Sequence, residues 1–205
     1  MALTALALNC SLKPSPEASS TSKLTGELFA ELTRLGVASV EEVRLADHDV
    51  KHSTSADAGE GDAWPAIRAK VHAADILVLA TPIWNGQPSS WASVVYERLN
   101  AELSDLDDRQ RTPLFGKVAL CVVVGNEDGN YHVGGITYQV LTDMGATVPA
   151  QPILYWHGPA GGSQDYTDLD EQPDNVKKVL PVLASNAVHL AGLLAASPYP
   201  GVAAE

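Results

Sequence analysis

Two uninterrupted apolar runs constrain the fold of this chain more than any other feature of its sequence. Ile76–Ala80 is the clearer run and ends abruptly at Thr81-Pro82, whereas Lys117–Val124 leads into a glycine-rich segment. Strands that are apolar along their whole length are typical of parallel sheets, because helices cover both faces of such sheets. The two runs therefore predict two interior strands of a parallel sheet.

Strand-like and helix-like segments alternate along the rest of the chain. Further strands are expected over Leu3–Leu8, Val37–Leu45 and Val148–Trp156. Helical spacing of apolar residues predicts helices from about Ser20 to Gly36, from Asp62, over Ser90–Leu103, over Gly134–Met144, and from about residue 175 to Ala196. This alternation predicts a single α/β domain over residues 1–205. Its expected architecture is a doubly wound, five-stranded parallel sheet of flavodoxin-like order 2-1-3-4-5, with helices on both faces.

Composition narrows the classes of partner and cofactor. A formal net charge of -12 argues against nucleic acid, because binding to a phosphate backbone rests on clustered Lys and Arg. The charge leaves an anionic cofactor open, since backbone N–H groups at a helix N-terminus bind anions without net positive charge. Cys10 and Cys121 lie in or beside apolar runs and are expected to be free buried thiols, with a disulfide or redox pair as the alternative. No Cys/His spacing suggests a metal site.

No membrane span is expected. The longest late apolar stretch, Val179–Ala196, is interrupted by a proline, an asparagine and a histidine. The apolar N-terminus, residues 1–9, is too short for the apolar region of a signal sequence, and no lysine or arginine precedes it. These features together predict a cytoplasmic protein.

The predicted topology places ligands beyond the carboxyl ends of the strands, so site residues are expected in the loops after strands 1, 3 and 4. The first of these loops leads into a helix and is rich in hydroxyl side chains: Ser11, Ser15, Ser19, Ser20, Thr21 and Ser22. Hydroxyls and free N–H groups at a helix N-terminus suit a phosphate monoester. The alternative is that these residues serve only as helix caps and loop formers.

The other two loops suit a flat heteroaromatic ring. After strand 3, the ring of Trp84 can stack on a flat ligand. The turn at Asn85-Gly86 can bring backbone N–H donors close to that ligand. The alternative there is a turn in which Trp84 packs on the neighbouring loop. After strand 4, the glycines of Gly125–Gly129 permit close approach to a ligand, and a solvated turn is the alternative. The coincidence of three such loops at one sheet edge favours the ligand-binding interpretation.

The same three loops carry a family resemblance. Asn9–Lys13 followed by Ser19–Thr21 is similar to the N-G-S-x-R and S-x-N/T-x-x-L phosphate loop of the NADPH-dependent FMN reductases and flavodoxin-like NAD(P)H quinone reductases. Ala80–Gly86 resembles their T-P-x-Y/W-N-G-S flavin loop, and Gly125–Gly129 with His132 resembles a G-N-E-D-G-x-x-H loop of flavodoxin-family proteins. The resemblance extends over most of the chain.

Residue by residue, the resemblance implies an FMN site. The phosphate would be held by Ser11, Lys13, Ser19, Ser20 and Thr21. The isoalloxazine would be lined by Pro82, Ile83, Trp84, Asn85 and Gly86, with Gly125, Asn126, Glu127, Asp128 and Gly129 on its other edge. His132 is the one catalytic candidate, as a hydrogen-bond donor to the acceptor or the flavin. The alternative for His132 is a surface histidine on the first turn of a helix.

The implied activity is hydride transfer from NADH or NADPH through FMN to a quinone-like or other small acceptor, without a metal. The resemblance also implies a homodimer or a dimer of dimers. Candidate contact residues are Trp91, Tyr155 and Trp156, with core packing as the alternative for each. Two other classes stay open on the same fold. One is a flavodoxin-type electron carrier without its own NAD(P)H turnover, and the other is a flavin-free signalling or interaction domain.

Overall fold

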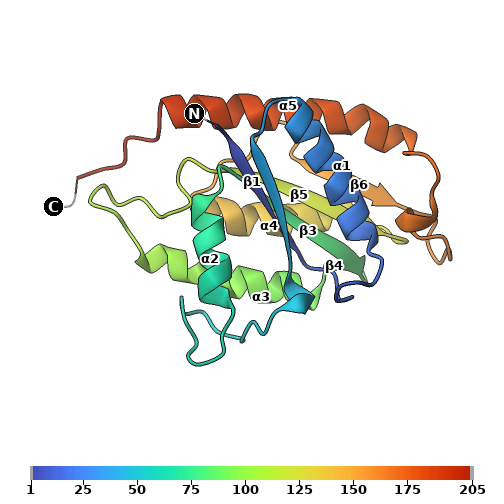
Figure 1. Ribbon diagram of the computed structural model, residues 1–205, viewed down its shortest axis with the longest axis horizontal. Coiled ribbons are helices and arrows are strands. Elements are labelled where there is room, and N and C mark those ends of the chain that lie inside the picture. The colour runs from blue at the N-terminus through green and yellow to red at the C-terminus, as the bar shows by residue number, and fades with distance from the viewer. Residues whose placement is uncertain (1, 204–205) are drawn as a thin grey trace.

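The computed structural model describes residues 2–203 and contains one sheet with a central parallel path (Figure 1). Its strands are β1 (Thr4–Asn9), β2 (Ser39–Arg44), β3 (Ile76–Trp84), β4 (Gln87–Pro88), β5 (Val118–Gly125) and β6 (Ile153–His157). The parallel order is β2-β1-β3-β5-β6, and β4 pairs with β3 in an antiparallel hairpin. Apart from that hairpin, this is the predicted flavodoxin-like order.

Helices connect the strands in the expected alternation. They are α1 (Ser20–Arg34), α2 (Trp64–Ala73), α3 (Ser90–Leu99), α4 (Asn130–Asp143) and α5 (Asp174–Ala196), with short 3₁₀ helices η1 (Leu45–Asp47), η2 (Asn100–Ser104) and η3 (Tyr166–Asp168). Several expected bounds were wrong. The strand expected to end at Thr81-Pro82 continues to Trp84 as β3, and the helix expected from Asp62 begins at Trp64. The helix expected over Ser90–Leu103 changes to 3₁₀ geometry at Asn100, α4 begins four residues before Gly134, and β6 begins only after the prolines at 149 and 152.

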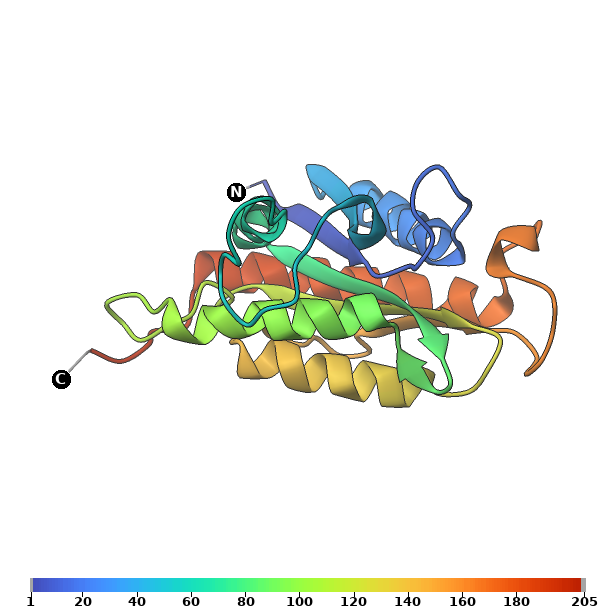
Figure 2. The ribbon, with the colours of Figure 1, turned by 90° about the horizontal axis from the view of Figure 1, so that it is seen from below.

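The sheet is the middle layer of three: Figure 1 shows α1 and α5 above the strands and α2 and α3 below them, and Figure 2 looks onto the sheet from the α2 and α3 side. Helices α1 and α5 cover one face and α2, α3 and α4 the other. Alternate residues of β3 show the consequence, because Ile76 and Val78 pack toward α1 and α5 while Leu77 and Leu79 pack toward α2 and α3. A strand buried on both faces must be apolar throughout, which is why β3 and β5 were the clearest sequence signals.

Helix α1 brings its N-terminus to the carboxyl edge of the sheet. Ser19 caps the helix, and its hydroxyl accepts the N–H of Ser22 at 3.2 Å. Leu24, Leu28 and Leu32 are fully buried on one face of the helix. Amphipathic packing thus fixes α1 against the sheet, and its free first-turn N–H groups end beside the loop that follows β1.

Helix α5 has the length and the mean hydropathy, 1.7, of a helix that could cross a membrane. Its apolar character has another explanation, since Leu183, Ala184 and Ala187 are buried in the core that α5 forms with α1 and the sheet. A helix that covers a sheet needs such a face. The two cysteines, Cys10 and Cys121, are free and buried, which confirms that part of the sequence interpretation.

Candidate functional site

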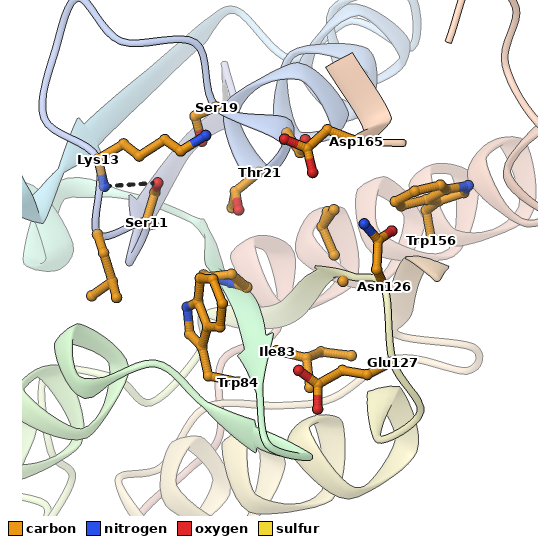
Figure 3. A pocket seen from close by; sticks show the side chains of 15 residues that line it. Ser11, Lys13, Ser19, Thr21, Ile83, Trp84, Asn126, Glu127, Trp156 and Asp165 are labelled. Atoms are coloured by element: carbon orange, nitrogen blue, oxygen red, sulfur yellow. Dashed lines mark hydrogen bonds between the residues drawn. The ribbon is translucent and has the colours of Figure 1, made fainter. Parts of the chain in front are cut away.

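One cavity of about 230 Å³ lies where the three predicted loops meet at the carboxyl edge of the sheet (Figure 3). It is lined by Ser11, Leu12, Lys13, Ser19, Ser20, Thr21, Pro82, Ile83, Trp84, Val124, Gly125, Asn126, Glu127, Trp156 and Asp165. Segments far apart in sequence converge there because parallel strands end at the same edge.

The end of the cavity beside α1 is built from hydroxyls. The N–H of Ser11 donates to the side-chain oxygen of Asn9 at 2.8 Å, and the N–H of Lys13 donates to Ser11 Oγ at 3.3 Å, which together fold the loop after β1 tightly. Ser19 and Thr21 are almost fully buried beside this loop, at the first turn of α1. Hydroxyls, helix N–H groups and the Lys13 ammonium form a donor set that fits a phosphate.

The opposite end of the cavity is formed by the β3–β4 hairpin. Asn85 and Gly86 both have positive φ, 52° and 71°, as a two-residue hairpin turn requires. Glu127 accepts both turn N–H groups, that of Asn85 at 3.1 Å and that of Gly86 at 2.7 Å. Trp84 stands just before the turn with 54% of its surface exposed, so its indole is available for stacking.

Glycines let the loop after β5 approach this hairpin. A Cβ on Gly129, which has φ +130°, would lie 3.0 Å from the Cα of Gly86. A Cβ on Gly125 would lie 3.0 Å from the Cβ of Ile83. Both distances are shorter than ordinary carbon contacts, so the two loops can touch only because these positions lack a side chain.

Asn126 offers an acceptor that the rest of the described chain does not use. Its Oδ1 is buried without a hydrogen-bond partner, while its Nδ2 donates to the carbonyl of Gly162 at 3.3 Å. A Cβ on Gly158 would lie only 2.3 Å from that oxygen. A buried unpaired acceptor in a ligand cavity points to a donor supplied by the ligand. With the hydroxyl end and the exposed indole, the cavity therefore fits a phosphorylated flavin.

Ser89 joins the first two loops beneath the cavity. Its hydroxyl donates to the carbonyl of Cys10 at 2.6 Å, and its N–H donates to Thr81 Oγ1 at 3.1 Å. The same hydroxyl caps α3 by accepting the N–H of Ala92 at 3.3 Å. One fully buried serine thus fixes the distance between the loop after β1 and the end of β3.

The structure brings most of the predicted site residues together, but not all. Asn85, Gly86, Asp128, Gly129 and His132 do not line the cavity, although the first two carry the turn N–H groups. His132 is exposed at the start of α4, where its Nε2 lies 3.2 Å from Gln87 Oε1. Its part in catalysis stays a prediction.

Four residues that line the cavity were not among the predicted site residues: Leu12, Val124, Trp156 and Asp165. For Trp156, the structure agrees with core packing, the alternative to a dimer contact, because its side chain is 7% exposed and its ring centroid lies 5.4 Å from that of Tyr166. Its position at the carboxyl end of β6 was a usable signal for the cavity. Asp165 lies in a long irregular segment that carried no signal.

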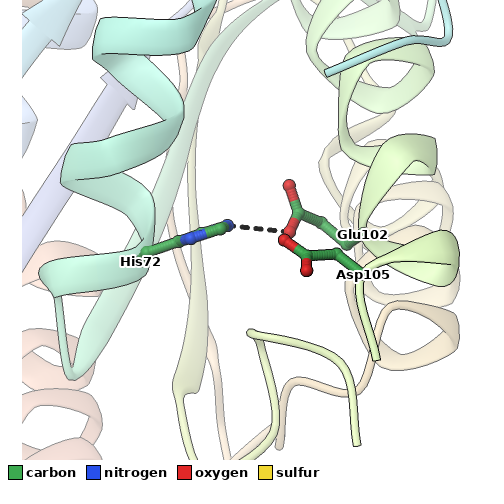
Figure 4. Close-up of side chains that lie close together, drawn as sticks. All are labelled: His72, Glu102 and Asp105. Atoms are coloured by element: carbon green, nitrogen blue, oxygen red, sulfur yellow. Dashed lines mark hydrogen bonds and ion pairs between the residues drawn. The ribbon is translucent and has the colours of Figure 1, made fainter. Parts of the chain in front are cut away.

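A second group of side chains, His72, Glu102 and Asp105, has the spacing of metal ligands (Figure 4). Both carboxylates are already paired with Arg68, whose guanidinium lies 2.7 Å from Glu102 Oε1 and 2.5 Å from Asp105 Oδ2. His72 Nε2 lies 2.8 Å from the other oxygen of Glu102. The group therefore acts as an ion-pair cluster that ties α2 to η2.

Comparison with known proteins agrees with this geometry. The sequence model of the NADPH-dependent FMN reductase family matches residues 3–159. The chain belongs to this family. Membership in the NADPH-dependent FMN reductases identifies an FMN-linked oxidoreductase-type enzyme and confirms the resemblance seen in the three loops.

Two curated proteins and one solved structure illustrate what this chain is similar to. The 8-demethyl-8-aminoriboflavin-5'-phosphate synthase of Streptomyces davaonensis is 36% identical over 209 residues, which cover 97% of this chain and 81% of that protein. A Mycobacterium bovis protein named divalent metal cation transporter MntH is 34% identical over 201 residues, 95% of this chain but only 29% of that protein. The crystal structure of RosB with bound 8-demethyl-8-formylriboflavin-5'-phosphate superimposes with a TM-score of 0.86 at 36% identity, over 97% of this chain and 82% of that one.

Proposed function

We propose that this protein is an NAD(P)H-dependent FMN oxidoreductase that reduces a quinone-like or other small acceptor. The observation that carries the proposal is one cavity with a hydroxyl-rich end and an exposed indole at its other end. The description of the matching family names both FMN and NADPH, which supports the choice of cofactor and donor.

The chain's own residues would bind and orient. Ser11, Ser19, Ser20, Thr21 and Lys13 would hold the phosphate, and Trp84 with Ile83 would fix the plane of the ring. Of the loop after β5, Asn126 and Glu127 line the cavity, and their backbone N–H groups would stabilise negative charge at the edge of the ring. When bound, FMN supplies the hydride-accepting and hydride-donating chemistry that the side chains lack.

A visible spectrum of the purified protein, followed by anaerobic addition of NADH and NADPH in turn, tests the proposal. We expect flavin absorbance that one or both nucleotides bleach and a quinone restores. A flavin that only dithionite reduces would instead indicate an electron carrier. A colourless protein that ignores added FMN would contradict the proposal and favour a flavin-free domain.

A second candidate function treats the flavin as the substrate rather than the cofactor. The observation in its favour is the 36% identity to a relative named as a synthase of a modified riboflavin phosphate, together with the TM-score of 0.86 to RosB. The same cavity would serve, because substrate and cofactor would share the phosphorylated flavin framework.

Mass spectrometry of the recovered flavin separates the two candidates. The protein is incubated aerobically with FMN, both alone and with ammonium or an amino acid as a nitrogen donor. It is then denatured, and the released flavin is compared with FMN kept in the same mixture without protein. Recovery of FMN at unchanged mass supports the cofactor role. A new flavin of different mass that forms only with the protein supports the second candidate.

We also propose that the protein assembles as a homodimer or a dimer of dimers. The family resemblance supports this assembly, and Tyr155 remains available as a contact residue because it lies on the edge strand β6. Exposed Tyr131 of α4 lies beside it, with ring centroids 5.6 Å apart. Sedimentation that shows only monomer at micromolar concentration would contradict the assembly.

A further inference from the structure

The segment of residues 158–174 forms a wall of the cavity, although the family match ends at residue 159. It follows β6, contains η3, and returns to the N-terminal half of α1 before α5 begins. This segment lies outside the motifs that the three loops share with the family. Its one residue in the cavity lining is Asp165, the residue before η3.

Polar contacts hold this segment firmly on α1. Lys23 Nζ donates to the carbonyls of Tyr166 at 3.0 Å and Leu169 at 2.7 Å. Glu27 accepts the hydroxyl of Tyr166 at 2.6 Å and the amide of Gln172 at 2.7 Å. Tyr166 is fully buried, and burial and then its bond to Glu27 raise the pKa of its hydroxyl, which therefore stays a donor.

By holding the segment on α1, the contacts of Lys23 and Glu27 place Asp165 at the hydroxyl end of the cavity. Asp165 caps η3 in a reciprocal arrangement with Asp168, whose Oδ2 accepts the N–H of Asp165 at 2.8 Å. Figure 3 shows its carboxylate facing Ser19 and Thr21, with Lys13 beyond them. Among the described lining residues, Lys13 is the one cation.

We propose that Asp165, positioned by Lys23 and Glu27, makes the site select flavin mononucleotide over flavin adenine dinucleotide. A single phosphate finds hydroxyls, helix N–H groups and Lys13 in this end of the cavity. The dinucleotide must carry a second phosphate past the wall that bears the Asp165 carboxylate, with no second cation to compensate it. Repulsion of the wrong ligand gives specificity without added contacts to the right one.

This inference rests on the proposed flavin site, and binding rather than turnover tests it. Apoprotein is titrated with riboflavin, FMN and FAD, and quenching of flavin fluorescence gives each Kd. Asp165→Asn removes the charge but keeps a good cap for η3. Asp170→Asn is the matched control, since it removes an exposed carboxylate of the same segment that does not line the cavity. Lys23→Met tests the positioning.

We expect Asp165→Asn to reduce the ratio of FMN affinity to FAD affinity about tenfold, with riboflavin affinity unchanged. Lys23→Met should reduce the same ratio, and Asp170→Asn should not. An unchanged ratio in Asp165→Asn, or an equal loss for all three flavins, overturns the inference while the flavin site itself stands. A wild-type protein that binds none of the flavins overturns the proposed function as well.

Discussion

The carboxylate of Glu127 accepts the backbone N–H of Gly86 at 2.7 Å, across a sequence separation of 41 residues. It also accepts the N–H of Asn85, so one side chain satisfies both donors of the β3–β4 turn. The turn has no other partner for these N–H groups among the hydrogen bonds of the described chain. Glu127 therefore fixes the hairpin that presents Trp84 to the cavity.

Replacing Glu127 should weaken flavin binding. In Glu127→Ala the turn loses two hydrogen bonds to a charged acceptor, each of which contributes about 1.5–3 kcal/mol in proteins. We expect the Kd for FMN, measured by fluorescence quenching, to rise about tenfold or more. Asp128→Asn is the control, because Asp128 is exposed and does not line the cavity. Equal effects of the two variants would mean that net charge, not the turn contact, matters.

Adding a methyl group at Gly129 should separate the two loops. Gly129 has φ +130°, and its Cβ would meet the backbone of Gly86. Gly129→Ala should therefore lower both the melting temperature and the affinity for FMN. Gly135→Ala makes the same chemical change inside α4, where nothing lies within 4 Å. It should raise stability by up to about 1 kcal/mol, and similar losses in both variants would refute the close-approach argument.

The prediction for His132 separates binding from turnover. Because His132 lies outside the cavity lining, His132→Ala should leave the Kd for FMN unchanged. If the imidazole donates a hydrogen bond to the acceptor or the flavin, kcat should fall about tenfold or more. Steady-state kinetics with a quinone measure this effect. Gln87→Ala, which removes the hydrogen-bond partner of His132, is the companion variant, and an unchanged kcat in His132→Ala would end the catalytic interpretation.

Removing one partner of the ion pair between Arg98 and Asp62 should strongly reduce stability. The two side chains are fully buried, with Arg98 Nη2 2.6 Å from Asp62 Oδ2. Arg98→Met leaves a buried carboxylate without its counter-ion, a change that costs about 3–5 kcal/mol in other proteins. Urea denaturation measures the loss. Lys177→Met, which breaks an exposed pair at 3.4 Å, should change stability by less than about 1 kcal/mol.

Stability should also fall in acid because of Asp62. Burial raises the pKa of this carboxyl, but the N–H groups of Ala58, Trp64 and Lys51, together with the Arg98 charge, lower it below its usual value. The stabilisation from Asp62 is therefore fully present above the unfolded pKa of about 4 and is lost as pH falls through the lower folded value. Urea denaturation of Asp62→Asn should show a weaker pH dependence between pH 4 and pH 2 than the wild type. An identical dependence would contradict this assignment.

Much of the architecture follows from the sequence because its causes are local. The residues of β3 are apolar on both faces because helices cover both faces, so Ile76–Ala80 could be identified as an interior strand without any contact information. The start of α1 was predictable from Ser19, whose capping hydroxyl acts within three residues. The three site loops followed from topology, because parallel strands end at one edge of a sheet.

Only the tertiary structure could place Asp165 and the partners of Glu127. The bond from Lys23 to the carbonyl of Tyr166 spans 143 residues and leaves no periodic pattern in either segment. Sequence therefore determines which elements form and which edge of the sheet carries the site, since those depend on hydrophobic periodicity and capping. The shape and charge of the cavity wall depend on which distant side chains meet, and only the packing of the complete chain decides that.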